Sequence, residues 1–235
     1  MLTINSVSKS FGDQEVLNDI SITLKKREIF ALLGPSGSGK TTLIKMMIGL
    51  ELPSAGTVLF QEEPLKSRTL YKNIGYMAQG DALYNELTAK ENLHFFADLY
   101  SLSKEVRKVR IQSLMGMVDL TEHLNKPVHQ YSGGVRRRLS LVIAMLHDPD
   151  ILILDEPTVG IDPVLRKNIW EAFQQLKLDG KTLFVTTHVM DEAERCDRLG
   201  LIRGGKLIAC DAPQFIKQSY DVSSIEDVFL SMEGM

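Results

Sequence analysis

The chain has 235 residues, of which 44% are hydrophobic and 24% are charged. This composition is typical of a folded globular protein and excludes extensive disorder. Lysine and arginine total 27, aspartate and glutamate total 30, and the formal net charge is -3. A near-neutral chain lacks the basic footprint of a general nucleic-acid-binding protein.

Three further classes find no support in the sequence. The longest apolar run, residues 141–146, is far shorter than the roughly 20 residues that cross a bilayer. If the protein acts at a membrane, we expect another chain to supply the membrane spans. The first ten residues lack the pattern of a secretory signal. Cys196 and Cys210 form no CxxC pair and lie in no His/Cys cluster, so we expect reduced thiols and no structural zinc.

The N-terminal third alternates short apolar segments with turn residues. The segment EIFALL is a continuous apolar run, which is typical of a strand buried on both faces of a sheet. A glycine-rich stretch follows it, and residues 41–48 then have helical character that ends at Gly49. Strands are predicted at residues 2–7, 20–24, 28–33, 56–60 and 74–78.

The middle of the chain is helical. Thr88 precedes Glu91 by three positions, which is the pattern of a capping box at a helix start. A second helix is predicted at residues 104–118 and a third at residues 132–146. The apolar positions of the second helix are Val106, Val109, Leu114 and Val118. We therefore expect a helical lobe over residues 81–148, inserted into an α/β frame.

The α/β pattern returns after the lobe. Asp162 and Pro163 are typical of a helix start, with a side-chain cap and proline in the first turn. That helix is predicted to run to about residue 178, and Gly204-Gly205 indicates a hairpin. The other predicted elements are strands at 151–154, 182–187, 199–202 and 206–209, a short helix at 189–195, and helices from Pro213 and Ser224.

The glycine-rich stretch fits the pattern GxxxxGK[ST] of a P-loop. Glycines let the backbone curl so that successive N–H groups face phosphate oxygens. The next helix places its positive dipole end at the same point. Lys40 can reach the β- and γ-phosphates of a nucleotide, and the Thr41 hydroxyl can bind Mg²⁺.

A P-loop enzyme also needs an acidic residue at the end of a neighbouring strand to hold Mg²⁺, and the sequence contains one. Four apolar residues at 151–154 lead to Asp155 and Glu156. Asp155 is the expected Mg²⁺ partner, directly or through water. Glu156 lies one residue further along, where it could accept a proton from an attacking water.

A third motif indicates which class of P-loop NTPase the chain resembles. Ser132, Gly133 and Gly134 follow Tyr131, begin a predicted helix, and lie between the P-loop and the acidic strand. The stretch resembles the LSGGQ signature of ABC ATPases. This resemblance covers essentially the whole chain and implies an α/β fold. It implies a P-loop NTPase core with a mixed sheet, an inserted helical subdomain, and one nucleotide-binding domain over residues 1–235.

Other positions match the same family in the same order. The resemblance implies that Phe11 stacks on adenine, that Gln79 senses Mg²⁺ and the membrane partner, and that His188 contacts the γ-phosphate. Gly160-Ile161-Asp162 resembles the loop that crosses the dimer interface. Taken singly, each has a plain structural alternative, and their ordered coincidence favours the functional interpretation. The implied nucleotide-binding residues are Phe11, Gly34, Pro35, Ser36, Gly37, Ser38, Gly39, Lys40, Thr41 and Thr42.

The implied mechanism is a head-to-tail homodimer that forms with ATP bound. Each ATP lies between the P-loop of one subunit and the signature of the other, with Glu156 as base and Lys40 and Mg²⁺ stabilising charge. Residues 131–141, 155–163 and 224–230 are similar to the ATPases of drug and lipid exporters. The implied partner is therefore a separate transmembrane permease, and the implied location is the cytoplasmic face of the membrane.

Two positions depart from the family pattern. Val135 stands where glutamine is frequent, and Arg27 stands where glycine is frequent. Arg136, Arg137 and Arg138 follow Val135 and are interpreted as a helical face or an interface rather than a nucleic-acid site.

Three other functions are less consistent with the sequence. A non-transport ABC ATPase acting on ribosomes or DNA usually has two such domains or a long coiled coil. A small-molecule kinase would not need the signature or His188. An inert regulatory module would be expected to have lost Lys40 or Glu156. We therefore expect the ATP-hydrolysing motor of a transporter, with an exporter as the best-supported type.

Overall fold

The computed structural model describes residues 1–65 and 71–233. The chain divides into two compact units, Met1–Leu70 with Thr182–Met235, and Tyr71–Lys181. Residues 66–70 and 234–235 of the predicted domain lie outside the described residues. Within the described ranges, no helix has both the length and the apolar character needed to cross a membrane.

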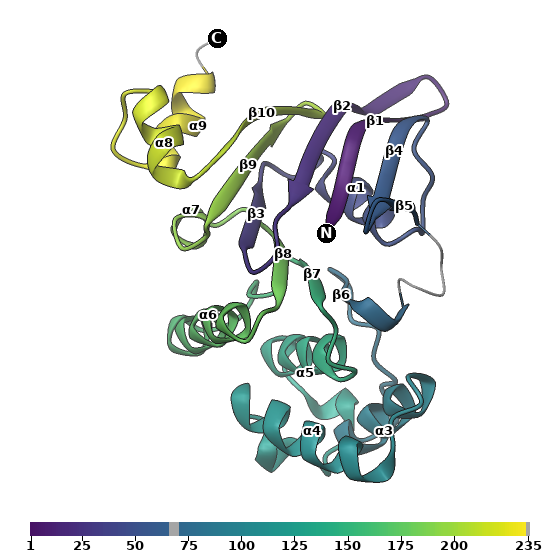
Figure 1. Ribbon diagram of the computed structural model, residues 1–235. Helices are drawn as coiled ribbons and strands as arrows, with labels where there is room; N and C mark the ends of the chain where they lie inside the picture. Colours follow the sequence, from purple (N-terminus) through teal and green to yellow (C-terminus); the bar gives the residue numbers. More distant parts are fainter. Residues whose placement is uncertain (66–70, 234–235) are drawn as a thin grey trace. The chain divides into compact units, whose positions relative to one another are not determined.

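The first unit contains an antiparallel sheet. Its strands are β1 (Leu2–Phe11), β2 (Gln14–Leu24), β4 (Ala55–Phe60) and β5 (Glu63–Pro64), in the order β2-β1-β4-β5 (Figure 1). In this sheet Leu2 is opposite Leu24 on one side and Phe60 on the other. β1 and β2 extend beyond the predicted 2–7 and 20–24 because they meet in a hairpin whose polar residues and register shifts hide the alternation.

The second sheet of this unit is mixed, as predicted. β3 (Ile29–Leu33) pairs in parallel with β8 (Thr182–Thr187) on one side and β9 (Arg198–Arg203) on the other. β10 (Lys206–Asp211) pairs antiparallel with β9, which confirms the hairpin at Gly204-Gly205. Every residue of β3 and β8 is buried, and Phe30 stacks on Phe184 with ring centroids 5.6 Å apart. The continuous apolar run therefore marked a strand covered on both faces.

Among its described residues this unit has four helices, and Figure 1 shows them beside its strands. They are α1 (Lys40–Met47), α7 (Met190–Ala193), α8 (Pro213–Ser219) and α9 (Ile225–Glu233). α1 begins directly after the glycine-rich stretch and packs against β2. The helix predicted over 189–195 is shorter than expected and has only four residues.

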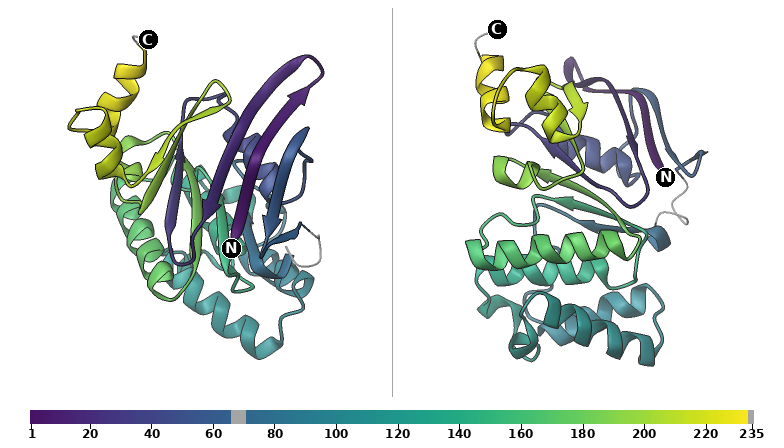
Figure 2. Two further views of the ribbon diagram at one scale, coloured as in Figure 1. Left: turned by 45° about the horizontal axis from the view of Figure 1, so that its top comes forward. Right: turned by 60° about the vertical axis from the view of Figure 1, so that its left-hand side comes forward.

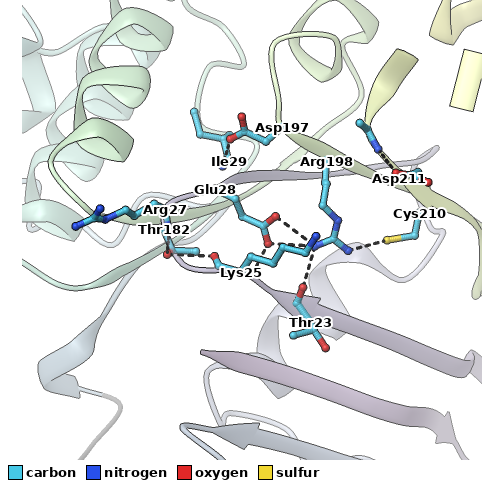
Figure 3. Close-up of polar contacts among 11 residues, drawn as sticks. Thr23, Lys25, Arg27, Glu28, Ile29, Thr182, Asp197, Arg198, Cys210 and Asp211 are labelled. Carbon is cyan, nitrogen blue, oxygen red and sulfur yellow. Dashed lines mark hydrogen bonds and ion pairs between the residues drawn. The ribbon is translucent and has the colours of Figure 1, made fainter. Parts of the chain in front are cut away.

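A partly buried ion pair lies at the start of β3. Glu28 is 5% exposed, and both of its carboxylate oxygens accept hydrogen bonds from Arg198 at 3.2 Å (Figure 3). The same guanidinium donates to the carbonyl of Thr23 at 3.0 Å and contacts the sulfur of Cys210 at 3.5 Å. Burial opposes the Arg198 charge, but Glu28 and Cys210 more than offset it, so the pKa of Arg198 is raised. The pair joins β2, β3, β9 and β10 in one polar cluster.

Arg27 lies beside this cluster in the left-handed region, with φ of 59°. Its backbone N–H donates to Oγ1 of Thr182 at 3.0 Å (Figure 3). Residues with a Cβ are strained at such a φ, whereas glycine is not. Glycine would therefore adopt this backbone geometry with less strain than arginine does.

The second unit consists of two parallel strands and a set of helices (Figure 2). β6 (Ile74–Met77) pairs with β7 (Ile151–Asp155), with Ile74 opposite Ile151. The helices are α3 (Ala89–Leu99), α4 (Lys104–Met117), α5 (Gly133–Met145) and α6 (Pro163–Leu178), with single 3₁₀ turns η1 (Thr121–His123) and η2 (Val128–Gln130). α3, α4 and α5 pack on one another, and α5 also contacts both strands.

The predicted helix starts in this unit are confirmed. Thr88 and Glu91 form the capping box of α3, and Asp162 accepts a hydrogen bond from the N–H of Leu165 at the start of α6. The predicted apolar face of α4 was partly wrong. Val106 and Val109 are 48% and 67% exposed, whereas the helix buries Ile111, Leu114 and Met115. The buried stripe starts one turn later than the apolar pattern suggested, because the first turns of α4 face solvent.

Candidate functional site

The P-loop of the first unit connects β3 to α1. Gly37 and Gly39 have φ of 79° and 101°, in the left-handed region that favours glycine. A Cβ on Gly34 would lie 2.3 Å from the carbonyl oxygen of Ile202, so no side chain fits there. The backbone therefore needs glycine at the curl and at the close approach to β9. Pro35, Ser36, Thr41 and Thr42 complete the predicted set, with both threonines in the first turn of α1.

Lys40 is held inside this curl. Its side chain is 6% exposed, and Nζ donates to the carbonyl oxygens of Gly34 at 2.7 Å and Pro35 at 3.1 Å. Ser38 is 4% exposed, and its buried hydroxyl oxygen has no hydrogen-bond partner within the described residues. Buried polar groups are almost always paired. A loop with an ammonium group, an orphaned hydroxyl and left-handed glycines fits a bound phosphate group.

Two other predicted residues belong to the same unit. Phe11 ends β1 with its ring 48% exposed, and Nζ of Lys9 lies 4.8 Å from the ring centroid. His188 follows β8 and is exposed. The residue before it, Thr187, is buried and donates its hydroxyl hydrogen to Glu192 at 2.7 Å. The backbone that carries His188 is therefore anchored on both a strand and a buried carboxylate.

The acidic residues lie in the second unit at the end of β7. Asp155 is 1% exposed and Glu156 is 9% exposed. Glu156 has φ of 51°, which is uncommon for a residue with a side chain and often marks a functional position. The amide nitrogen of Gln79 lies 3.4 Å from a carboxylate oxygen of Glu156. Two residues separated by 77 positions thus meet, a contact that the sequence analysis did not predict.

The signature lines the same cavity as this pair. A cavity of about 540 Å³ is bordered by Gln79, Glu156 and the triplet Ser132, Gly133 and Gly134. Ser132 is the residue before α5, so the first turn of the helix faces the cavity. A Cβ on Gly134 would lie 3.1 Å from the carbonyl oxygen of Gly160, which keeps this turn close to the next loop. The second unit therefore brings together Gln79, Glu156 and the signature.

The arginine triplet was misinterpreted. Arg137 and Arg138 are 6% and 7% exposed and bond to backbone carbonyls of their own unit. Arg136 donates to Asp81 at 3.0 Å. Two of the three arginines, Arg137 and Arg138, are therefore buried inside their unit and do not form an exposed helical face. A signal for this was available, since the arginines are followed within three residues by the apolar run 141–146 of the same predicted helix.

Arg137 is the residue of this site that sequence reasoning missed. It donates to the carbonyl oxygens of Ala78 and Gln79 at 2.8 Å and of Glu156 at 2.7 Å. Burial lowers the pKa of its guanidinium, and the carboxylates of Asp81, Asp155 and Glu156 oppose that effect. The group remains charged, because arginine keeps its proton throughout the physiological range.

An α/β fold with a P-loop between a buried strand and a helix defines a P-loop nucleotide-binding protein. Comparison with known proteins refines this class. Residues 17–159 match the ABC transporter family. The chain belongs to the ABC transporter family. Its predicted role as an ATP-binding, ATP-hydrolysing subunit of such transporters is confirmed by the relatives below.

Curated relatives include exporter subunits. The chain is 41% identical over 221 residues to the Nod factor export ATP-binding protein I of Burkholderia lata, covering 93% of this chain and 73% of that protein. It is 39% identical over 219 residues to the probable multidrug ABC transporter ATP-binding protein YbhF of Escherichia coli K12, covering 92% of this chain and 38% of the relative.

Solved structures agree with the fold prediction. A structure described as the ATP-binding subunit of an ABC transporter has a TM-score of 0.92 at 28% identity, covering 99% of both chains. A dimeric, post-hydrolysis structure of the cassette MJ0796 bound to ADP and Pi has a TM-score of 0.82 at 28% identity. The latter covers 90% of this chain and 98% of that one. The predicted α/β class with a mixed sheet is therefore confirmed.

Proposed function

We propose that this chain is the motor subunit of an exporter and that it couples Mg-ATP binding and hydrolysis to the movement of a separate membrane subunit. The observation that carries this proposal is the P-loop, where Lys40 is buried beside the orphaned hydroxyl of Ser38. The names of the relatives from Burkholderia lata and Escherichia coli favour export as the direction.

In this proposal the P-loop holds the triphosphate. Backbone N–H groups of residues 34–42 and the dipole of α1 face the phosphate oxygens. Lys40 exchanges its two loop carbonyls for phosphate oxygens, which are stronger acceptors because they are charged. The exposed ring of Phe11 stacks on the adenine.

The proposed metal ligands are the hydroxyl of Thr41, the carboxylate of Asp155 and the side-chain amide of Gln79. All three offer oxygen, the donor that Mg²⁺ prefers. When bound, Mg²⁺ would neutralise charge on the phosphates. The burial of Asp155 fits a carboxylate that faces a cation rather than solvent.

Glu156 is proposed as the general base. Its carboxylate would accept a proton from the attacking water. The nearby side-chain amide of Gln79 would help to orient this carboxylate. His188 would contact the γ-phosphate, and Lys40 would stabilise the charge that develops there. Ser132, Gly133 and Gly134 of a second copy would close over the nucleotide with the first turn of α5.

The proposed assembly follows from that closure. Two copies bind head to tail around two ATP molecules and separate after hydrolysis, because the γ-phosphate no longer bridges them. A transmembrane permease encoded as a separate chain binds the helical lobe, with residues 80–86 at the coupling surface. The subunit then lies on the cytoplasmic face of the membrane, and residues 1–235 act as one nucleotide-binding domain.

The direct test measures phosphate release and ATP binding for matched variants. Glu156→Gln should bind ATP with nearly unchanged affinity and lose hydrolysis about 100-fold or more. Lys40→Ala should lose binding and hydrolysis, whereas Lys45→Ala, an exposed lysine on the same helix, should change neither. Hydrolysis at the wild-type rate by the Glu156→Gln protein would contradict the assignment of the base.

A further inference from the structure

A single buried guanidinium connects three parts of the second unit. Arg137 lies on α5, one turn after the signature. It donates to the carbonyls of Ala78 and Gln79, both at 2.8 Å, and to the carbonyl of Glu156 at 2.7 Å from one nitrogen and 3.2 Å from another. A further hydrogen bond reaches the carbonyl of Asp155. The residue therefore holds the backbone on both sides of the Gln79–Glu156 contact.

The geometry requires arginine rather than any cation. The planar guanidinium presents five N–H donors in a fixed fork, so it can satisfy carbonyls from two separate segments at once. Nη1 serves the segment of Gln79, while Nε and Nη2 serve the segment of Glu156. Burying a charge is unfavourable unless its hydrogen bonds are satisfied, and here the donors go to backbone carbonyls.

The two backbone segments that Arg137 holds carry Gln79 and Glu156, whose side chains have roles in the proposed reaction. Glu156 adopts a left-handed backbone conformation, with φ of 51°. Its carbonyl is bonded to Arg137 and its carboxylate lies 3.4 Å from the Gln79 amide. A left-handed residue with a side chain persists only where its surroundings fix it. Loss of the guanidinium would free this backbone and that of Gln79 together.

We propose that Arg137 is a positioning residue for ATP hydrolysis. It sets the backbone of Glu156 and of Gln79 in register with each other, and it ties both to the signature helix α5. It acts through these two residues and does not itself contact the nucleotide. This inference rests on the proposed role of Glu156 as the base.

The neighbouring arginine provides a matched control. Arg138 is on the same helix and is equally buried, with 7% exposure against 6% for Arg137. It also donates to carbonyl oxygens, those of Val118 at 2.8 Å and Asp119 at 3.1 Å, with a longer contact of 3.4 Å to that of Gly134 in the first turn of its own helix. None of these acceptors belongs to the segments of Gln79 and Glu156. Removing either guanidinium should cost similar stability, and only one should affect the chemistry.

The test compares steady-state ATPase kinetics of Arg137→Gln, Arg137→Lys and Arg138→Gln in the full chain, with melting temperatures and ATP affinities. We expect kcat of Arg137→Gln to fall about 10- to 100-fold with KM changed less than about threefold, the size of effect that misplaced catalytic groups produce. Arg137→Lys keeps the charge but lacks the fork, so its kcat should fall at least about tenfold. Arg138→Gln should melt at a temperature similar to that of Arg137→Gln and keep kcat within about threefold of wild type.

Two results would overturn the inference. One is a wild-type kcat in a folded Arg137→Gln protein, and the other is an equal loss of kcat in Arg138→Gln. If Arg137→Gln does not fold, the kcat of Arg137→Lys decides by the same criterion. An unchanged ATPase rate in Glu156→Gln would instead overturn the proposed base, so the two failures are distinguishable.

Discussion

His147 should make the stability of the second unit depend on pH. It follows α5, and its ring stacks on Tyr100 with centroids 3.8 Å apart. Nε2 lies 3.2 Å from the carbonyl oxygen of Ile74, so it is the nitrogen that carries the hydrogen. Nδ1 is buried and has no partner in the part of the chain that the structure describes. A second proton would therefore lie where no acceptor meets it.

The size of the effect follows from the pKa. Burial, aided by the charges of Arg110 and Lys181, lowers the pKa of His147 from 6.5 to about 4. This difference in pKa between the unfolded and the folded chain corresponds to about 3 kcal/mol of unfolding free energy. Because the ring is only partly buried and solvent screens the charge, we expect protonation of His147 to lower the unfolding free energy by about 2 kcal/mol.

The direction is set by which state binds the proton. Between pH 6.5 and about 4 the unfolded chain protonates His147 and the folded chain does not, so acid favours unfolding. The stability is fully present above pH 6.5 and is lost as the pH falls towards 4.

The assay is urea unfolding followed by the fluorescence of Trp170, the single tryptophan and a buried residue of α6 in the same unit. His147→Phe is the control, because it keeps an aromatic ring against Tyr100 but does not titrate. Between about pH 7 and pH 4, wild type should lose about 2 kcal/mol more unfolding free energy than the variant. Parallel losses in the two proteins would refute the reasoning.

Three other predictions follow from single positions. Arg27→Gly removes left-handed strain and should raise the unfolding free energy by up to about 1 kcal/mol, measured in urea. Gly75→Ala places a Cβ 2.0 Å from the carbonyl oxygen of Ala144 and should destabilise by about 2–3 kcal/mol or more. Gly116→Ala, on α4 with open space around the Cβ, is the control and should stabilise slightly. Burial raises the pKa of Cys210 although Arg198 opposes it, so an aromatic disulfide reagent at pH 8 should react with this thiol at least about tenfold more slowly in the folded chain than in urea.

The elements that the sequence predicted well are those with strong local signals. The apolar runs of β3 and β7 led to fully buried strands, and the caps at Thr88 and Asp162 marked the starts of α3 and α6. The P-loop was evident because its glycines must adopt φ values that other residues avoid.

What could not be predicted depends on contacts between distant segments. The exposed face of α4 is set by which turns α5 covers, not by the apolar pattern of α4 alone. The role of Arg137 is visible only when the segments of Gln79 and Glu156 come together around it. A charged side chain in sequence normally indicates solvent, and only the fold shows that backbone carbonyls surround this one.

The central claim is that ATP closes two copies of this chain around the nucleotide. Size-exclusion chromatography of the Glu156→Gln protein with and without Mg-ATP tests it most directly, because removal of the base leaves binding intact and traps the sandwich. The account predicts a monomer without nucleotide and a dimer with Mg-ATP, together with loss of the wild-type ATPase rate. A protein that elutes as a monomer in both conditions would contradict the account.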